Sequence, residues 1–284
     1  MCPTTGRRTC FERCGELGQN TGVLIGMTNI QKANLEIDEN RNRRPDRGAI
    51  SDAPSPAASV MLMAGGRGER LMPLSNAAPK PMLHIGDRLA LEPIICSFVD
   101  HGLHNIFISV HYMGDVIENH FGDGAYWGAN ISYIREATPL GTAGSLKLLP
   151  ANLDKPVIVM NADIVSAFDI TDLLARHSKS GADATVTTTS YKQTIPFGVI
   201  RQVNGQILEI SERPTSNFDI CAGIYVLSPN ALSYLPEEQR HDMPEFLNAL
   251  NDADCKIVSY DIQSDWMDIG TIEDYRRAQI LTAG

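Results

Sequence analysis

The chain has 284 residues, of which 43% are hydrophobic and 20% are charged, as is ordinary for a soluble globular protein. Its formal net charge of -10 argues against a general nucleic-acid-binding protein, because such proteins usually carry a basic surface. No apolar run approaches the roughly 18 residues that a membrane-spanning helix needs. The six cysteines include no Cys-x-x-Cys pair, which argues against a zinc site. We therefore expect a cytoplasmic protein that binds neither nucleic acid nor membrane.

The first 58 residues differ from the rest in charge and composition. They hold 8 Lys and Arg against 7 Asp and Glu, whereas the remainder holds 16 against 27. Residues 41–47 form a charged segment interrupted by proline, and residues 51–58 are rich in Pro, Ala and Ser. Both compositions are typical of linkers. We expect residues 1–58 to be a poorly structured extension, followed by one domain at residues 59–284.

From residue 59 onward, short apolar runs alternate with amphipathic stretches. A buried strand is expected at residues 60–63, before a glycine-rich loop, and the apolar spacing predicts a helix over residues 91–101. Strands and helices then follow in turn, with strands at 106–110, 131–134, 157–160 and 184–189 and helices at 115–121, 145–149 and 170–180. This alternation predicts an α/β fold with a mostly parallel sheet and helices on both faces.

The next stretch departs from this alternation. Two strands at residues 198–202 and 206–210 flank Asn204-Gly205, a dipeptide typical of tight hairpin turns. A further strand is expected at residues 220–227, so an antiparallel insert follows the α/β unit. The chain then closes with a helix near residues 245–250, a strand at 256–260 and a helix at 272–281.

The densest functional signal is the string AGGRGERLMPL at residues 64–74, followed by Pro79-Lys80-Pro81. Its glycines follow a buried strand and can bring backbone N–H groups against phosphate oxygens. Arg70 and Lys80 can neutralise phosphate charge, arginine through its planar fork and lysine as a point charge. The spacing fits neither a P-loop, which needs Gly-Lys-Ser/Thr, nor the dinucleotide-binding fingerprint. An NAD-dependent oxidoreductase is accordingly disfavoured.

This string resembles the signature of the sugar-phosphate nucleotidyltransferases, in which AGG-x-G-[T/E]-R-[L/M]-x-P-L precedes PKP. The resemblance extends over most of the chain after residue 59. It implies a Rossmann-like nucleotide-diphospho-sugar transferase fold, in which the antiparallel insert lines the sugar site. It also implies that the loop wraps the nucleotide triphosphate, through Ala64, Gly65, Gly66, Gly68, Glu69 and Arg70.

A second motif, EATPLGTAG at residues 136–144, resembles the loop with which this family reads the base. The resemblance assigns Glu136, Gly141 and Thr142 to nucleotide binding. Glu136 stands where thymidylyl-transferring members have glutamine. A carboxylate accepts from two donors, as guanine N1–H and its exocyclic amine require, whereas uracil and thymine offer one donor. This favours GTP, with a UTP- or dTTP-using enzyme as the alternative.

Two acidic residues follow predicted strands. Asp163 ends Asn161-Ala162-Asp163, after the strand at residues 157–160, and Asp268 lies in WMDIGT at residues 266–271. The carboxyl end of a central strand is a common position for functional groups in α/β sheets. The resemblance pairs the two aspartates as the carboxylates that hold a catalytic Mg²⁺. Two carboxylates with phosphate oxygens and water suit octahedral Mg²⁺.

Two motifs of the insert resemble the sugar side of the family's site. Glu212-Arg213-Pro214 corresponds to Glu-Lys-Pro, in which Glu contacts sugar hydroxyls and Lys contacts the sugar phosphate. Arg213 keeps the charge of that lysine but not its shape. Gly198 follows Phe197 where the family has Tyr-Gly-Val, whose glycine lets the sugar lie against backbone. Lys80, Gly198, Glu212 and Arg213 are thus the expected sugar-phosphate-binding residues.

The implied reaction joins a sugar 1-phosphate to an NTP and releases pyrophosphate. The expected catalytic residues are Arg70, Lys80, Asp163 and Asp268, with Mg²⁺ as the cofactor. The loops look most similar to bacterial GTP-using members that act on mannose, heptose or amino-sugar 1-phosphates for surface polysaccharides. The other alternative is a non-catalytic relative that binds a nucleotide sugar, although such relatives typically lose the Arg, Lys or Asp positions. A homo-oligomer is compatible with the sequence.

Overall fold

The computed structural model describes residues 57–237 and 239–282. The expectation for residues 1–58 therefore concerns positions that lie outside this range, apart from Ala57 and Ala58. Ala58 is buried in the core, directly before the first strand.

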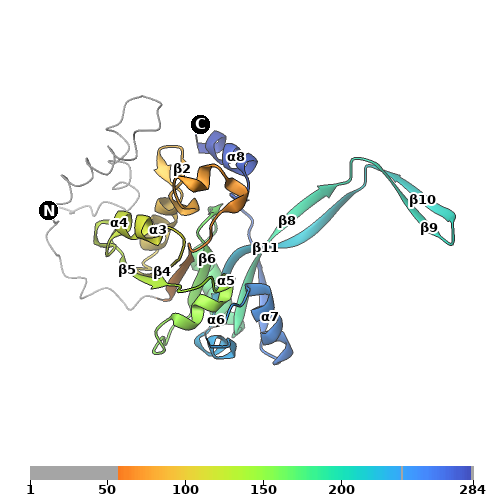
Figure 1. The fold of residues 1–284 in the computed structure, drawn as a ribbon. Helices are drawn as coiled ribbons and strands as arrows, with labels where there is room; N and C mark the ends of the chain where they lie inside the picture. The colour runs from red at the N-terminus through yellow and green to blue at the C-terminus, as the bar shows by residue number, and fades with distance from the viewer. Residues whose placement is uncertain (1–56, 238, 283–284) are drawn as a thin grey trace, which may run out of the picture.

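A seven-stranded sheet in the order β12-β8-β11-β6-β1-β4-β5 forms the body of the protein (Figure 1). The central strand β1 (Ser59–Met63) pairs in parallel with β6 (Val157–Asn161) on one side and β4 (Asn105–Val110) on the other. β5 (Asn130–Arg135) continues the parallel order next to β4. β1, β4 and β6 are short, mostly apolar runs, whereas β5 mixes polar and apolar residues. Together the four strands confirm the predicted mostly parallel sheet.

The other half of the sheet contains the predicted antiparallel strand. β11 (Thr215–Leu227) pairs antiparallel with β6 and also with β8 (Ala184–Thr194), and β12 (Ile257–Asp261) pairs in parallel with β8. Both β8 and β11 are longer than predicted, because each continues beyond the sheet. The hairpin of β9 (Gly198–Val203) and β10 (Gln206–Glu212) connects them, with Asn204-Gly205 at its turn.

Helices cover both faces of the sheet, since the strand side chains alternate between two core clusters. Val60 and Leu62 belong to the cluster that includes side chains of α3, α4 and α6, whereas Met61 belongs to the cluster with α5 and α7. The helices are α3 (Leu91–Asp100), α4 (Gly114–Phe121), α5 (Gly141–Gly144), α6 (Ile170–Ser180), α7 (Met243–Asp252) and α8 (Ile272–Thr282). None of these described helices combines the length and the apolar character that a membrane span requires.

Several short elements lack the length that an apolar pattern needs to be recognised in the sequence. They include two antiparallel pairs, β2 (His84–Ile85) with β3 (Arg88–Leu89) and β7 (Ile164–Ser166) with β13 (Trp266–Asp268). In the part of the chain that the structure describes, six 3-10 helices lie at η1 (Glu69–Leu71), η2 (Leu74–Asn76), η3 (Lys80–Met82), η4 (Ala125–Trp127), η5 (Ser145–Leu148) and η6 (Pro229–Tyr234). The helix expected at residues 145–149 is the 3-10 helix η5, which follows α5 directly.

The antiparallel insert forms a long arm, defined here as residues 190–219, that projects from the body (Figure 1). β8 pairs with β12 only as far as Thr188, and beyond that point the β8–β11 ladder continues alone. At the base of the arm the register between β8 and β11 shifts between Cys221 and Tyr225. Gly223 lies in this bulge with a φ of +73°.

We expect Gly223→Ala to lower the free energy of unfolding by about 1–3 kcal/mol, because an L-residue is strained at positive φ. An added Cβ would also lie 2.5 Å from Ile164 Cδ1 and 2.9 Å from Asn161 Nδ2. Chemical denaturation measures the change. Gly66→Ala is the control, since a Cβ at Gly66 meets no atom within 4 Å. Equal free energies of unfolding for the two variants would contradict the requirement for glycine at position 223.

Candidate active site

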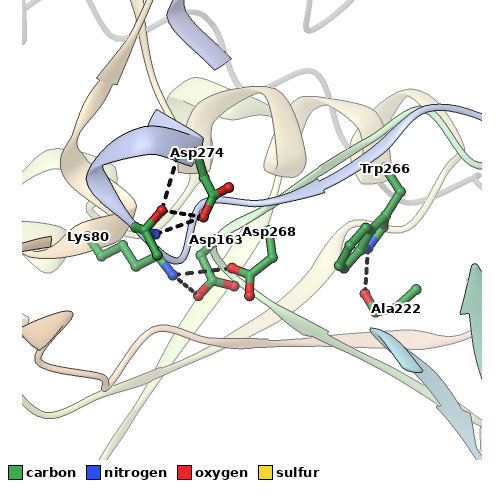
Figure 2. Close-up of polar contacts among 7 residues, drawn as sticks. Lys80, Asp163, Ala222, Trp266, Asp268 and Asp274 are labelled. Carbon is green, nitrogen blue, oxygen red and sulfur yellow. Dashed lines mark hydrogen bonds and ion pairs between the residues drawn. The ribbon is translucent and has the colours of Figure 1, made fainter. Parts of the chain in front are cut away.

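Lys80 reaches both Asp163 and Asp268 with its ammonium group at the candidate site (Figure 2). Its Nζ forms an ion pair with Asp163 Oδ2 and lies 3.4 Å from Asp268 Oδ1. The two aspartates adjoin because β7 pairs with β13, which places Asp268 opposite Ile164. The Ile269 N–H also donates to the Asp163 carbonyl over 3.0 Å. The structure therefore brings together three of the four residues expected to be catalytic.

Arg70, the fourth of these residues, lies beside Asp268. A Cβ added to Gly270 would lie 3.7 Å from Arg70 Nη2 and 3.5 Å from Asp268 Oδ2, so both side chains reach the same glycine. The positive charges of Lys80 and Arg70 also act on Asp268, where they oppose the rise in its pKa that burial causes. All four side chains thus meet in one cluster.

The two carboxylates form an electrostatically strained pair. Burial raises the pKa of Asp268 above its ordinary value, and repulsion from Asp163 raises it further, although Lys80 and Arg70 act in the opposite direction. Asp163 Oδ1 is buried and has no hydrogen-bond partner among the described residues. An orphaned carboxylate oxygen beside a second carboxylate fits a divalent cation that prefers oxygen ligands.

The glycine-rich loop begins where β1 ends and adjoins this cluster. The Ala64 N–H donates to the Ser109 carbonyl over 3.0 Å, which ties the start of the loop to β4. Gly68 adopts a φ of +62°, and Ser75 Oγ donates to its carbonyl over 2.8 Å. A Cβ at Gly68 would lie 3.4 Å from Lys80 Cβ. The stem of Lys80 therefore lies directly beside the loop.

The loop offers free space on its outer side. Gly66, Glu69 and Arg70 are exposed, Gly65 is half-buried, and a Cβ added to Gly66 would meet nothing within 4 Å. Arg67 differs from Arg70, because its guanidinium lies over the Tyr112 ring, 5.8 Å from the centroid. This open backbone next to Lys80 can take a polyanion.

Glu136 is held in place by protein groups on both of its carboxylate oxygens. Oε1 accepts a hydrogen bond from the Ser109 hydroxyl, and Oε2 accepts one from the Leu140 N–H over 2.8 Å. A Cβ at Gly65 would lie 3.2 Å from Oε1, so the carboxylate rests against the glycine-rich loop. Each oxygen keeps a further lone pair for a ligand donor. Base reading by Glu136 stays a prediction.

Gly141 and Thr142 contact the segment that precedes α7. Gly141 has a φ of +78°, and an added Cβ would lie 2.5 Å from Asp242 Oδ1. The Thr142 hydroxyl accepts a hydrogen bond from the Met243 N–H over 2.7 Å. Packing against Asp242 is therefore enough to require a glycine at position 141. Thr142 satisfies a backbone N–H at the start of α7. Their contact with a nucleotide stays a prediction.

The three residues of the insert that are predicted to bind the sugar phosphate lie on the arm. Gly198 and Glu212 are paired across the β9–β10 hairpin, and Arg213 follows with its Nε 3.7 Å from Glu212 Oε1. All three are exposed. Because β8 and β11 continue as a ladder that projects from the body, the structure does not bring these residues to Lys80 of the same chain (Figure 1).

The sequence alone did not point to several residues that position the site. Ser75 and Ser109 hold Gly68 and Glu136, and the Trp266 indole N–H donates to the Ala222 carbonyl over 2.8 Å (Figure 2). The last contact joins the strand of Asp268 to the base of the arm. An isolated glycine within a strand, such as Gly223, is the signal that marks such a close backbone approach.

Comparison with known proteins identifies the relatives of this chain. The family model described as nucleotidyl transferase matches residues 59–283. A mannose-1-phosphate guanylyltransferase from Mycobacterium tuberculosis is 33% identical over 225 residues, which are 77% of this chain and 62% of that protein. A UTP–glucose-1-phosphate uridylyltransferase from Synechocystis is 29% identical over 239 residues, with the same two coverages. The chain thus spans less than two thirds of the length of these relatives.

Solved structures agree with the fold. HddC from Yersinia pseudotuberculosis has a TM-score of 0.63 and 24% identity, over 79% of this chain and 99% of that one. A glucose-1-phosphate thymidylyltransferase structure from Bacillus anthracis, described as putative, has a TM-score of 0.62 and 23% identity, over 79% and 95%. From its family match and its fold, this chain belongs to the nucleotidyl transferase family.

Proposed function

We propose that this protein transfers a guanylyl group from GTP to a sugar 1-phosphate, which gives a GDP-sugar and pyrophosphate. The observation that carries the proposal is the cluster of Lys80, Asp163, Asp268 and Arg70 beside an open glycine-rich loop. Such a cluster combines two cations for phosphate oxygens with two carboxylates for a divalent cation.

The chemistry needs charge control and not a general base. A phosphate oxygen of the sugar 1-phosphate, already ionised at neutral pH, attacks the α-phosphorus in line. The bond from the α-phosphorus to the oxygen that bridges to the β-phosphate breaks, and pyrophosphate leaves with the electron pair. Lys80 and Arg70 hold the approaching polyanions and stabilise the charge that develops on the leaving group. The backbone N–H groups of Gly65 and Gly66 orient the triphosphate.

Asp163 and Asp268 are the residues that would hold Mg²⁺. The orphaned Asp163 Oδ1 and the raised pKa of Asp268 both support this assignment, since a cation would satisfy the first and relieve the second. The described residues contain no group of three or more His, Cys, Asp or Glu suited to a metal. Phosphate oxygens and water would complete the coordination, and Mg²⁺ would supply neutralisation of phosphate charge.

Two observations support GTP as the nucleotide. Glu136 offers two acceptor oxygens in a fixed orientation, which match the paired donors of guanine. A relative that is 33% identical is a mannose-1-phosphate guanylyltransferase. UTP is the second candidate, because a relative that is 29% identical is a uridylyltransferase.

We expect Lys80→Ala to lower the rate of pyrophosphate release about 10²–10³-fold, as the loss of one charge contact to the reacting phosphates does in other sites. The assay offers the wild type four NTPs and a panel of sugar 1-phosphates. Arg67→Ala is the matched control, because this loop cation contacts Tyr112. An equal loss of the rate of pyrophosphate release in the two variants would contradict a direct role of Lys80 at the reacting phosphates. Binding without turnover across the whole panel would indicate a non-catalytic relative.

Glu136→Gln tests base reading. We expect kcat/KM for GTP to fall about tenfold or more relative to UTP, because an amide provides one acceptor oxygen where guanine needs two. The readout is the ratio of kcat/KM for GTP to kcat/KM for UTP, since a general loosening of the loop around Glu136 would lower both values alike. Glu118→Gln, the same change at a carboxylate that pairs with Arg135, is the control and should leave the ratio unchanged. An unchanged ratio in Glu136→Gln would contradict base reading by this residue.

Asp268→Asn tests the carboxylate pair without an activity assay. The Asp268 carboxyl has a raised pKa in the folded state, so it holds its proton to a higher pH there than in the unfolded chain. Its ionisation therefore lowers the stability of the folded state as the pH rises from the unfolded pKa through the folded pKa. We expect the variant to have a higher Tm than the wild type at pH 7 in metal-free buffer, and the difference to vanish in acid. Added Mg²⁺ should raise the Tm of the wild type only. A lower Tm of the variant at pH 7 would contradict the strained pair.

A further inference from the structure

The arm lacks the burial that stabilises the rest of the chain. None of the described core clusters includes a residue between positions 187 and 221. Of 16 exposed large hydrophobic residues in the described chain, nine lie in the arm: Tyr191, Ile195, Phe197, Ile200, Val203, Ile207, Leu208, Ile210 and Phe218. Isolated two-stranded ribbons are marginally stable in water, and exposed apolar edges are open to association. The arm therefore needs a covering surface.

Two apolar side chains near the tip of the arm share one face of the hairpin. Ile200 and Ile210 are directly opposite each other in the β9–β10 register, with exposed fractions of 53% and 64%. Gly198 and Glu212 form the next pair on the same face, because strand side chains alternate with a period of two. A Cβ at Gly198 would lie 3.3 Å from Glu212 Oε2 and 3.9 Å from Ile210 Cγ2, which confirms the shared face. A surface that covers the isoleucines thus also meets Glu212.

We propose that the arm covers a second copy of this chain and supplies Glu212 and Arg213 to the sugar-phosphate site of that copy. This inference rests on the proposed function, and on the motif by which Glu212 and Arg213 are expected to bind the sugar phosphate together with Lys80. Within one chain the arm carries them away from that cluster (Figure 1). Two substrates that both carry phosphate bring more negative charge than Lys80 and Arg70 alone balance, and Arg213 adds a cation. Reciprocal exchange of arms buries both apolar faces and closes a two-fold dimer.

Sedimentation velocity tests the interface at the concentrations used for the assays. We expect the wild type to be a dimer and Ile200→Ser/Ile210→Ser to be a monomer. Val203→Ser is the matched control: Val203 is also exposed and hydrophobic, but it lies on the opposite face of the same hairpin. It should remain a dimer. A monomeric wild type, or a dimer that survives the double substitution, would overturn the proposal.

Complementation tests whether the site is shared. Glu212→Gln and Asp268→Asn should each have little activity as pure proteins. Co-expressed and purified together, they should recover about a quarter of the wild-type activity, because half of randomly assorted dimers are mixed and each mixed dimer has one site free of both substitutions. Activity no higher than that of the separate variants would mean that the arm bends back onto its own chain.

Two outcomes separate this inference from the proposed function. A wild type that forms the arm-dependent dimer but turns over none of the NTPs and sugar 1-phosphates would remove the proposed reaction and leave the arm interface intact. A wild type that is active while Glu212→Gln keeps full activity, or while the mixed variants fail to complement, would overturn the shared site alone.

Discussion

One ammonium group holds two carboxylates of like charge together at the centre of this protein. Burial and repulsion from Asp163 raise the pKa of Asp268, and Lys80, which contacts both carboxylates, acts in the opposite direction. The same lysine has its stem against Gly68, so its position also depends on the glycine-rich loop. The balance of charge in the cluster therefore depends on the path of the glycine-rich loop, because both depend on the position of Lys80.

Positions far apart in the chain reach this cluster because of strand pairing. β1 and β6 are parallel neighbours, so the glycine-rich loop and the segment with Asp163 leave the sheet at the same edge. The short β7–β13 pair then adds Asp268 from near the end of the chain. Backbone hydrogen bonds between paired strands thus place the glycine-rich loop, Asp163 and Asp268 close together, and their side chains meet as a result. Arg70 needs no ladder, because η1 continues directly from the loop.

The sequence predicted the fold well wherever a local pattern determined the structure. The apolar runs of β1, β4 and β6, the interspersed apolar residues of β5 and the Asn204-Gly205 turn are such patterns. The motifs around Lys80, Asp163 and Asp268 identified residues that the structure brings together. The direction of the arm had no such signal, because neither strand spacing nor a turn says what a hairpin packs against. The contacts of Gly141 and Glu136 also depended on segments distant in sequence, namely those of Asp242 and Ser109.

The hydrogen bond from Trp266 to Ala222 links two parts of the molecule that otherwise look independent. Trp266 lies two residues before Asp268, and Ala222 adjoins the glycine bulge from which the arm departs. A ligand that fixes the position of Asp268 therefore acts on the same strand that fixes the arm at its pivot. Any coupling through this contact is reciprocal: the factor by which an engaged arm changes the affinity of the cluster equals the factor by which an occupied cluster changes engagement of the arm. In a dimer of exchanged arms, this provides a route to cooperativity between the two sites.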